Sequence, residues 1–284
     1  MPDTHIALIF DFDDTLVPDS TSQFLAENGI DPDNFWTEEH KPLLEKGYDP
    51  ANAWLQLILD RVGPDNELGE ITTEDLRHFG TTLNEETFDG LPELFEDLND
   101  IVDDYHDTTI DYYIISGGLR NIILGTEISD YMTAIYASEF AQHHEDWITH
   151  IKRSVNFTEK TRYLFEINKG LQYSHTRTNP YIVNTPMDES ERRVPWENMI
   201  YVGDGTTDVP CFSLIKKQGG QPYGIFNPDN ESSKQQAIEL MEAPDRVQAA
   251  YKPKFSESGD IGNIIRSKVE GICFDNETSG HQAL

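Results

Sequence analysis

The sequence is poor in cysteine, in basic residues and in long apolar runs. Its 284 residues include only two cysteines, Cys211 and Cys273. Two cysteines cannot build a disulfide framework, which fits a reducing interior. No apolar run approaches the roughly 18 residues that a membrane span requires, and the N-terminal residues lack the basic start and apolar stretch of a signal peptide. We therefore expect a soluble, cytoplasmic protein without a membrane partner.

Basic residues are scarce relative to acidic ones. The chain holds 21 Lys and Arg against 52 Asp and Glu, which gives a net charge of −31 and a pI near 4.4. This balance argues against nucleic acid and anionic membranes as general partners, because both require a basic surface. The acidic residues are spread along the chain, and two explanations stay open. One is a halophilic host, since excess carboxylate keeps a protein hydrated in strong salt; the other is an ordinary acidic protein with a solvated surface.

Hydrophobic residues are abundant enough to fill a sizeable core. They make up 37% of the chain, and aromatic residues make up 11%, which excludes a wholly disordered protein. Several short β-prone segments are almost continuously apolar, a pattern typical of strands buried on both faces of a parallel sheet. The predicted strands span residues 5–10, 109–115, 134–140 and 199–202.

Helical patterns lie between these predicted strands. Apolar residues recur at helical spacing over residues 94–105, and a second helical pattern over residues 158–169 ends at Gly170. Strands that alternate with helices predict an α/β fold with a doubly wound, Rossmann-like parallel sheet.

One long segment interrupts the alternation. Residues 17–87 contain turn signals and short helical patterns, which predicts a small helical cap domain inserted into a core formed by residues 1–16 and 88–284. Residues 171–195 form a polar stretch that is too long for a routine loop, and we expect a surface elaboration there. The last ten or so residues are predicted to be frayed.

Acidic residues gather where the predicted strands end. Asp11 and Asp13 follow the first strand, and Asp204 and Asp208 follow the strand at 199–202 within a glycine-containing turn. Open α/β sheets bind ligands at the carboxyl ends of their strands. Four converging carboxylates would repel one another unless a cation lies among them, and all-oxygen ligation suits Mg²⁺.

Groups that can bind an anion also follow a predicted strand or lie near the start of a predicted helix. Residues 116–118 read Ser-Gly-Gly after a predicted strand, so a hydroxyl and backbone N–H groups are available there. Lys160 lies near the start of a predicted helix and supplies a positive charge. Each of these motifs or residues, taken alone, is more often a simple turn or a solvated side chain than part of an active site. Their combination, in order and with matching chemistry, favours a phosphate-handling active site.

The order Asp-x-Asp-x-Thr, Ser-Gly-Gly, Lys and Gly-Asp-x-x-x-Asp resembles the haloacid dehalogenase (HAD) superfamily of hydrolases. The phosphoserine-phosphatase-like branch is the nearest match, because the motifs Ser-Gly-Gly at residues 116–118 and Gly-Asp-Gly at residues 203–205 are typical of it. The resemblance covers residues 5–228, with the inserted helices in the place of that family's cap. It implies an α/β core that carries the reaction and a cap that selects the substrate.

The resemblance also implies roles for individual residues. Asp11 would attack phosphorus and form an aspartyl-phosphate. Asp13 would protonate the leaving oxygen and then deprotonate the attacking water. Ser116 and the N–H groups around Gly117 would bind the phosphoryl group, and Lys160 would neutralise its charge together with that of the nucleophile.

The same resemblance implies a Mg²⁺ cofactor, held by the Asp11 carboxylate, the Asp13 carbonyl, Asp204 and Asp208. A second acid at Asp13 favours phosphate chemistry over dehalogenation, since a halide leaves without a proton. The expected function is a Mg²⁺-dependent phosphatase that acts on a small phosphorylated metabolite. A phosphotransferase or phosphomutase, and a non-enzymatic phospho-acceptor with a regulatory role, stay open. The substrate and the oligomeric state are not fixed by the sequence.

Other polar residues are assigned no role in the reaction. The run at residues 143–146 resembles a metal cluster, but adjacent residues in a turn rarely converge on one ion, so a loop is predicted. Cys211 is expected to be a packed thiol. Six polar residues of the predicted cap are candidates for substrate selection, although each is expected to lie on a solvated surface: Gln23, Glu27, His40, Arg61, Arg77 and His78.

Overall fold

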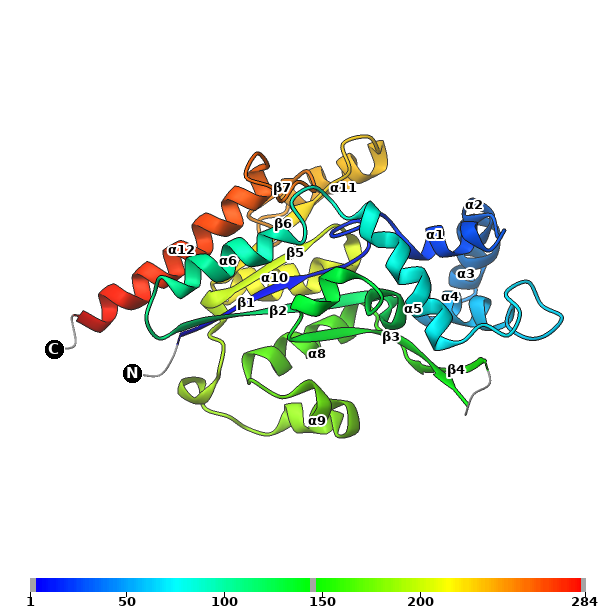
Figure 1. The fold of residues 1–284 in the computed structure, drawn as a ribbon, viewed down its shortest axis with the longest axis horizontal. Helices are drawn as coiled ribbons and strands as arrows, with labels where there is room; N and C mark the ends of the chain where they lie inside the picture. The colour runs from blue at the N-terminus through cyan, green and yellow to red at the C-terminus, as the bar shows by residue number, and fades with distance from the viewer. Residues whose placement is uncertain (1–3, 144–146, 282–284) are drawn as a thin grey trace.

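A seven-stranded sheet forms the centre of the computed structural model, which describes residues 4–143 and 147–281 (Figure 1). The strand order is β4-β3-β2-β1-β5-β6-β7. Neighbouring strands are parallel except for β3 and β4, which are antiparallel. The strands are β1 (Thr4–Phe10), β2 (Thr108–Leu119), β3 (Ala134–Gln142), β4 (Ile148–Arg153), β5 (Met199–Gly203), β6 (Gln221–Ile225) and β7 (Ala249–Tyr251).

Side chains of β1 alternate between two hydrophobic layers. Ile6, Leu8 and Phe10 belong to one buried cluster, and Ala7 and Ile9 belong to the other. A strand that is apolar on both faces needs helices on both sides of the sheet. Helices α6 and α12 cover the first face, and α8 and α10 cover the second. The predicted doubly wound α/β core is therefore confirmed. These helices are α6 (Glu93–Asp103), α8 (Phe157–Asn168), α10 (Val209–Lys217) and α12 (Asp260–His281).

The winding direction reverses between β1 and β5. From β1 the chain moves outward to β2, β3 and β4, and it then returns to add β5, β6 and β7 on the other side of β1. Such a reversal leaves a crevice outside the carboxyl ends of the two strands that flank it. The residues that follow β1 and β5 are thereby placed around this crevice.

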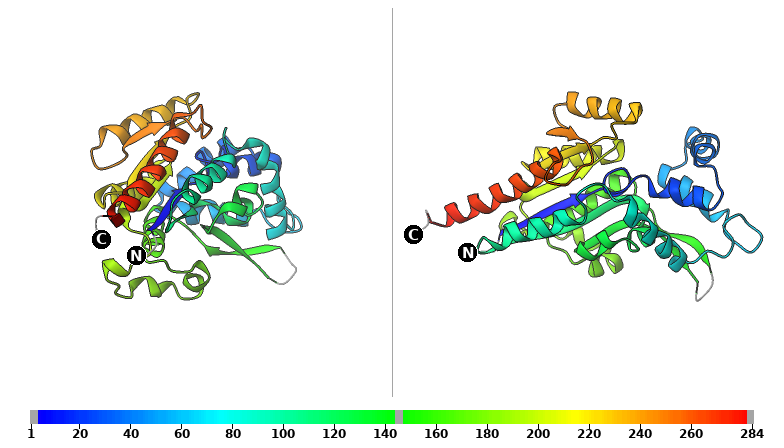
Figure 2. Two further views of the ribbon diagram at one scale, coloured as in Figure 1. Left: turned by 60° about the vertical axis from the view of Figure 1, so that its left-hand side comes forward. Right: turned by 45° about the horizontal axis from the view of Figure 1, so that its top comes forward.

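The segment 17–87 forms a group of helices beyond the carboxyl end of β1 (Figures 1 and 2). Its apolar side chains join the core cluster on the α6 side of the sheet. Helix α5 also approaches α7 (Arg120–Ile123) closely, because Gly80 and Gly125 lack side chains at the contact. The helical character of this segment agrees with the sequence, whereas the division into two domains stays a prediction. The elements are α1 (Ser20–Glu27), α2 (Pro32–Asn34), η1 (Phe35–His40), α3 (Lys41–Glu45), α4 (Pro50–Leu59), α5 (Thr73–Thr82) and η2 (Leu83–Glu86).

Three features differ from the sequence predictions. Strand β2 continues through residues 116–118 to Leu119, with an irregular register against β3, instead of ending before the serine. Strands β4, β6 and β7 were not predicted. The predicted fraying of the C-terminal residues is wrong as far as His281, because α12 runs to that residue. Of the predicted 143–146 loop, residues 144–146 lie outside the described part of the chain.

The polar stretch 171–195 contacts strands β2 and β3 through ion pairs. Arg177 forms an ion pair with Glu139 of β3 at 2.8 Å, and Arg193 forms one with Asp111 of β2 at 2.8 Å. These contacts fit the predicted surface elaboration. The remaining short elements are α7 (Arg120–Ile123), η3 (Glu127–Tyr131), α9 (Tyr173–Thr178), η4 (Pro180–Asn184), η5 (Glu189–Glu191), η6 (Trp196–Asn198), η7 (Thr206–Asp208) and α11 (Glu231–Glu242).

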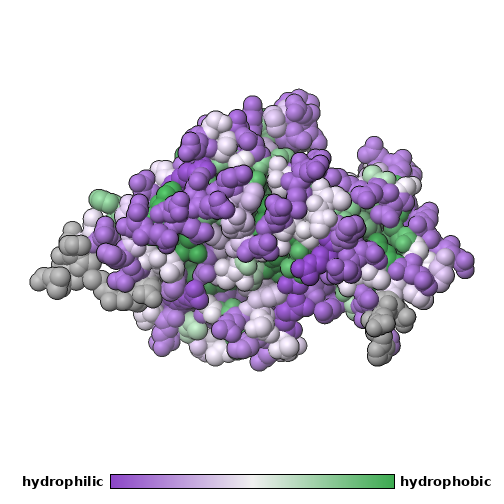
Figure 3. Space-filling model, in the orientation of Figure 1, coloured by the Kyte–Doolittle hydropathy of each residue, from purple (hydrophilic) through white to green (hydrophobic). Residues whose placement is uncertain are grey.

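The outer surface reflects the composition. The face in Figure 3 is mostly hydrophilic, with hydrophobic residues in small patches. Cys211 and Cys273 are free thiols and are buried, and burial raises the pKa of the Cys211 thiol, as expected for a packing residue. Of the helices in the described residues, none combines the length and the apolar character that a membrane crossing needs.

Candidate active site

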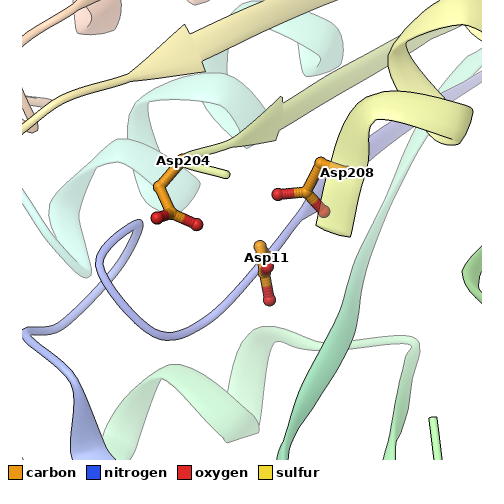
Figure 4. A group of neighbouring side chains, drawn as sticks. All are labelled: Asp11, Asp204 and Asp208. Atoms are coloured by element: carbon orange, nitrogen blue, oxygen red, sulfur yellow. The ribbon is translucent and has the colours of Figure 1, made fainter. Parts of the chain in front are cut away.

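Three aspartates meet where the winding of the sheet reverses. Asp11 follows β1 directly, Asp204 follows β5, and Asp208 lies one short turn further on (Figure 4). One carboxylate oxygen of each lies within 4.8 Å of the others. Asp11 and Asp208 are buried, with 6% and 0% of their surfaces exposed, and Asp204 is partly exposed. Of the four acids that were predicted from the sequence to converge, Asp11, Asp204 and Asp208 lie together, and the Asp13 carboxylate does not belong to this group.

Backbone and side-chain donors fix two of these carboxylates. The backbone N–H of Phe12 donates to Asp11 Oδ1 at 2.7 Å. The hydroxyl of Tyr201 donates to Asp208 Oδ1 at 2.7 Å, and the N–H of Gly205 donates to Asp208 Oδ2 at 3.3 Å. Asp208 is therefore held from two sides by groups of the same strand–turn unit.

Lys160 lies between two of the acids. Its Nζ donates to Asp11 Oδ2 at 2.5 Å and to Asp208 Oδ1 at 2.7 Å, and only 1% of its surface is exposed. Burial alone would lower the pKa of Lys160, but the two carboxylates outweigh burial and raise it, so the side chain stays charged. The lysine lies in the first turns of α8, whose N-terminus is capped by the Asn156 side chain.

The charges at this point do not balance within the protein. Three carboxylates face one ammonium. Burial, followed by repulsion from Asp11 and Asp208, raises the pKa of Asp204 well above its ordinary value. Burial and Asp208 likewise raise the pKa of Asp11 to about 7, against the opposing effect of Lys160. A divalent cation among the three oxygens would remove the excess negative charge, and an all-carboxylate donor set suits a hard cation such as Mg²⁺. The residues present therefore fit the expected metal.

Asp13 faces away from this cluster, toward the start of α1. Its Oδ1 accepts hydrogen bonds from the Ser20 N–H at 2.8 Å and from the Ser20 hydroxyl at 2.5 Å. Burial and the nearby Asp19 carboxylate raise the pKa of Asp13 to about 8. This raised pKa favours the protonated form of Asp13, which suits a general acid. The role predicted for the Asp13 carbonyl at the metal stays a prediction.

The Ser-Gly-Gly segment forms another wall of the site. The Gly118 N–H donates to Ser116 Oγ at 3.0 Å, which leaves the hydroxyl hydrogen of this buried serine for another acceptor. A Cβ atom at Gly118 would lie 2.5 Å from Asp13 Oδ2, so the second glycine makes room for the Asp13 carboxyl group. Ser116 and Gly117 were predicted to bind phosphate, and they border the same space as Asp11 and Asp13.

A cleft of about 240 Å³ joins these groups. Most of its wall comes from the segments at the carboxyl ends of β1, β2 and β5, and the inserted helices complete it. Lys160 and Asp208 lie behind this wall, in contact with Asp11. The lining residues are Asp11, Asp13, Asp14, Asp19, Thr21, Trp36, Trp54, Ser116, Gly117, Gly118, Asp204 and Thr207.

Several members of the site were not predicted from the sequence. Tyr201, Ser20 and the two tryptophans at positions 36 and 54 belong to no motif, and they reach the site only through the strand register or the fold of the insertion. Of the described residues that line the cleft, none is among the polar cap candidates named from the sequence. One of these candidates, Arg61, forms an ion pair with Glu39 within the inserted segment.

Comparisons with known proteins place this geometry in context. No protein-family model matches the chain. A protein of Borreliella burgdorferi, described as uncharacterized, is 29% identical over an alignment of 304 residues that covers 93% of this chain and 96% of that protein.

Solved structures with a similar fold are hydrolases. A HAD-family hydrolase of Salmonella enterica serovar Typhi has a TM-score of 0.56 at 15% identity, over 88% of this chain and 67% of that one. A substrate-bound phosphoserine phosphatase has a TM-score of 0.52 at 14% identity, over 93% and 98% of the two chains. A cytosolic 5′-nucleotidase IIIB bound to cytidine has a TM-score of 0.51 at 14% identity, over 95% and 87%. The chain therefore has the fold of the HAD-family hydrolases, in its phosphoserine-phosphatase-like form.

The charge imbalance at the aspartate cluster predicts a thermal response to metal. Addition of MgCl₂ at constant ionic strength should raise the melting temperature, because an ion that binds only the folded state stabilises it. Asp204→Asn should abolish that response and should raise the melting temperature without metal, because it removes one of three mutually repelling carboxylates.

Differential scanning calorimetry measures both effects. Asp229→Asn, at an exposed aspartate outside the cleft, is the matched control and should respond to Mg²⁺ as the wild type does. A full Mg²⁺ response in Asp204→Asn would show that the metal binds elsewhere.

Proposed function

We propose that this protein is a Mg²⁺-dependent phosphatase that hydrolyses a small phosphomonoester through an aspartyl-phosphate at Asp11. The supporting observation is the presence of two carboxyl groups with different surroundings at one cleft. The Lys160 ammonium stabilises the ionised form of Asp11, as a nucleophile requires. Burial and Asp19 stabilise the protonated form of Asp13, as a general acid requires.

In the first step, a carboxylate oxygen of Asp11 forms a bond to phosphorus while the ester P–O bond breaks. The departing oxygen takes the proton of Asp13, so that a neutral alcohol leaves. Lys160 and the Phe12 N–H hold the Asp11 carboxylate in place, which removes the cost of orienting it during the reaction.

In the second step, a water molecule attacks the phosphorus of the aspartyl-phosphate. Asp13 is now ionised and accepts a proton from this water. The bond between phosphorus and Asp11 breaks, inorganic phosphate leaves, and both aspartates return to their starting states. One carboxyl group thus acts first as an acid and then as a base.

The phosphoryl oxygens meet donors on the protein. The Ser116 hydroxyl and the backbone N–H groups near Gly117 border the cleft, and the Lys160 charge lies directly behind Asp11. Mg²⁺, held by the carboxylates of Asp11, Asp204 and Asp208, would neutralise phosphoryl charge that builds up during both steps. Asp13 also favours hydrolysis over a stable phospho-acceptor role, because it activates the water that cleaves the phospho-enzyme.

Replacement of the nucleophile tests the proposal. Asp11→Asn should lower Mg²⁺-dependent phosphate release by at least about 10³-fold, because an amide oxygen cannot form the covalent intermediate. The assay uses a panel of phosphorylated metabolites, and p-nitrophenyl phosphate as a general substrate, at low and at molar KCl. Asp229→Asn serves as the control. Wild-type rates in Asp11→Asn would contradict the covalent mechanism, and turnover only with an added acceptor alcohol would indicate a phosphotransferase.

Replacement of the general acid should produce an effect that depends on the leaving group. Asp13→Asn should lower kcat by about 10² to 10⁴-fold for alkyl phosphates, whose alkoxide needs a proton in order to leave. The loss in the first step should be much smaller for p-nitrophenyl phosphate, whose phenolate leaves unprotonated. Pre-steady-state measurement of the released nitrophenol separates the two steps. Equal losses of the first step for both ester types would exclude Asp13 as the acid.

A further inference from the structure

The part of the cleft that is lined by the inserted helices and by the segment after β1 has a distinctive composition. Two indole rings, of Trp36 and Trp54, and two carboxylates, of Asp14 and Asp19, border the space into which a leaving group would extend. Among the described lining residues, none is a lysine, an arginine or a histidine. The positive charge available at Lys160 is engaged by Asp11 and Asp208 at the phosphoryl end. The two ends of the cleft therefore differ in chemistry.

The two indole rings are held in place by the fold of the insertion. Their centroids are 6.4 Å apart, and their planes are inclined by 60°. Trp54 is 8% exposed and belongs to the main hydrophobic cluster, whereas Trp36 is half-buried against it. The Trp36 indole N–H donates to the Ser22 hydroxyl at 2.8 Å, so its polar atom is satisfied within the cap and its ring supplies π surface to the cleft.

Asp19 is linked to the same tryptophan. The Ser22 hydroxyl, which accepts from Trp36, donates in turn to the Asp19 carboxylate. Asp19 also caps α1 by accepting from the Ser22 N–H at 3.0 Å. An aromatic ring and a carboxylate are thus fixed relative to each other on one wall. Asp14, which is exposed and has a left-handed backbone with φ of 55°, contributes a second carboxylate to the cleft.

Rings and carboxylates together attract one class of ligand. The face of an indole ring attracts a cation, most strongly an alkylated ammonium, and a neighbouring carboxylate adds to that attraction. An anionic group in the same position would face Asp14 and Asp19, and no cationic side chain is among the described residues that line the cleft there. A substrate such as serine phosphate, which carries its own carboxylate, is therefore a poor match for this wall.

We propose that the cleft accepts a phosphomonoester whose alcohol carries an ammonium group, with the cation placed against Trp36, Trp54 and Asp19. This inference rests on the proposed phosphatase function and specifies its substrate class. The phosphoryl group lies at the Asp11 end, and the positively charged end of the substrate lies at the cap. Trp36 is then a specificity-determining residue that takes no part in proton transfer, whereas Asp19 attracts the cation and also raises the pKa of Asp13.

A pair of isosteric substrates tests the role of the charge. Choline phosphate is compared with its neutral carbon isostere, in which carbon replaces the quaternary nitrogen, and with serine phosphate. We expect kcat/KM to be about tenfold or more higher for choline phosphate than for the isostere, and lowest for serine phosphate. Equal or better turnover of the isostere, with activity that still requires Asp11, would overturn this inference and leave the proposed phosphatase function standing.

Two variants test which residues cause the preference for choline phosphate over its neutral isostere. Trp36→Leu should bring the ratio between choline phosphate and its isostere close to one, while turnover of the isostere changes by less than about threefold. Asp19→Asn should also lower this ratio; because the Asp19 carboxylate raises the pKa of Asp13, this variant is judged by the ratio alone and not by its absolute turnover. Asparagine caps a helix as well as aspartate does, so the second variant keeps α1 intact. Trp147→Leu, at a partly buried tryptophan outside the cleft, and Asp31→Asn, at the cap of α2, are the matched controls and should keep the wild-type ratio.

Binding of the free alcohol gives a readout that does not need turnover. Choline should quench tryptophan fluorescence in the wild type and in Trp147→Leu, and the change should be lost in Trp36→Leu. If no ester releases phosphate, the proposed phosphatase function fails, and this titration still tests the cation-binding wall. No quenching by choline, or equal quenching by its neutral isosteric alcohol, would overturn the assignment of the wall.

Discussion

The ammonium of Lys160, buried between the carboxylates of Asp11 and Asp208, is the interaction on which the rest of the site depends. It joins the turn after β1, the turn after β5 and the first turns of α8 at one point. An unpaired charge in this position would be costly to bury, so the three elements stabilise one another only when all are in place. Because Asp11 and Asp208 share the Lys160 ammonium, Asp204 has no ion-pair partner among the described residues. This charge imbalance is the physical reason to expect a bound metal.

The cleft combines two opposite electrostatic environments within a short distance. At its floor, Lys160 and the expected cation favour a phosphoryl group, although the chain as a whole carries a charge of −31. Remote carboxylates matter little there, because salt screens their charge: the Debye length falls to about 3 Å in molar electrolyte. At the cap, Trp36 and Asp19 favour a positive charge. In the proposed function, the core carries out the reaction and the insertion selects what is attached to the phosphate.

Features that depend on local sequence and on strand ends were predictable, and features that depend on packing were not. Asp11 and Asp204 could be placed together because parallel strands end at the same edge of a sheet. Strand β6 was missed because it is short and contains Pro222, a residue that argues against a central strand. Tyr201 joins the site through the alternation of β5, and Trp36 through the fold of the insertion. Neither residue carries a motif, so only the three-dimensional structure reveals their positions.

The central claim is that Asp11 becomes covalently phosphorylated during turnover. The most direct measurement is mass spectrometry of the peptide that contains Asp11, after acid quenching of the Asp13→Asn variant during reaction with p-nitrophenyl phosphate and Mg²⁺. The account predicts the added mass of one phosphoryl group on Asp11, and its absence when Asp11 is also replaced by asparagine. Steady turnover with no phosphoryl group on Asp11, or with the group on another residue, would contradict the account.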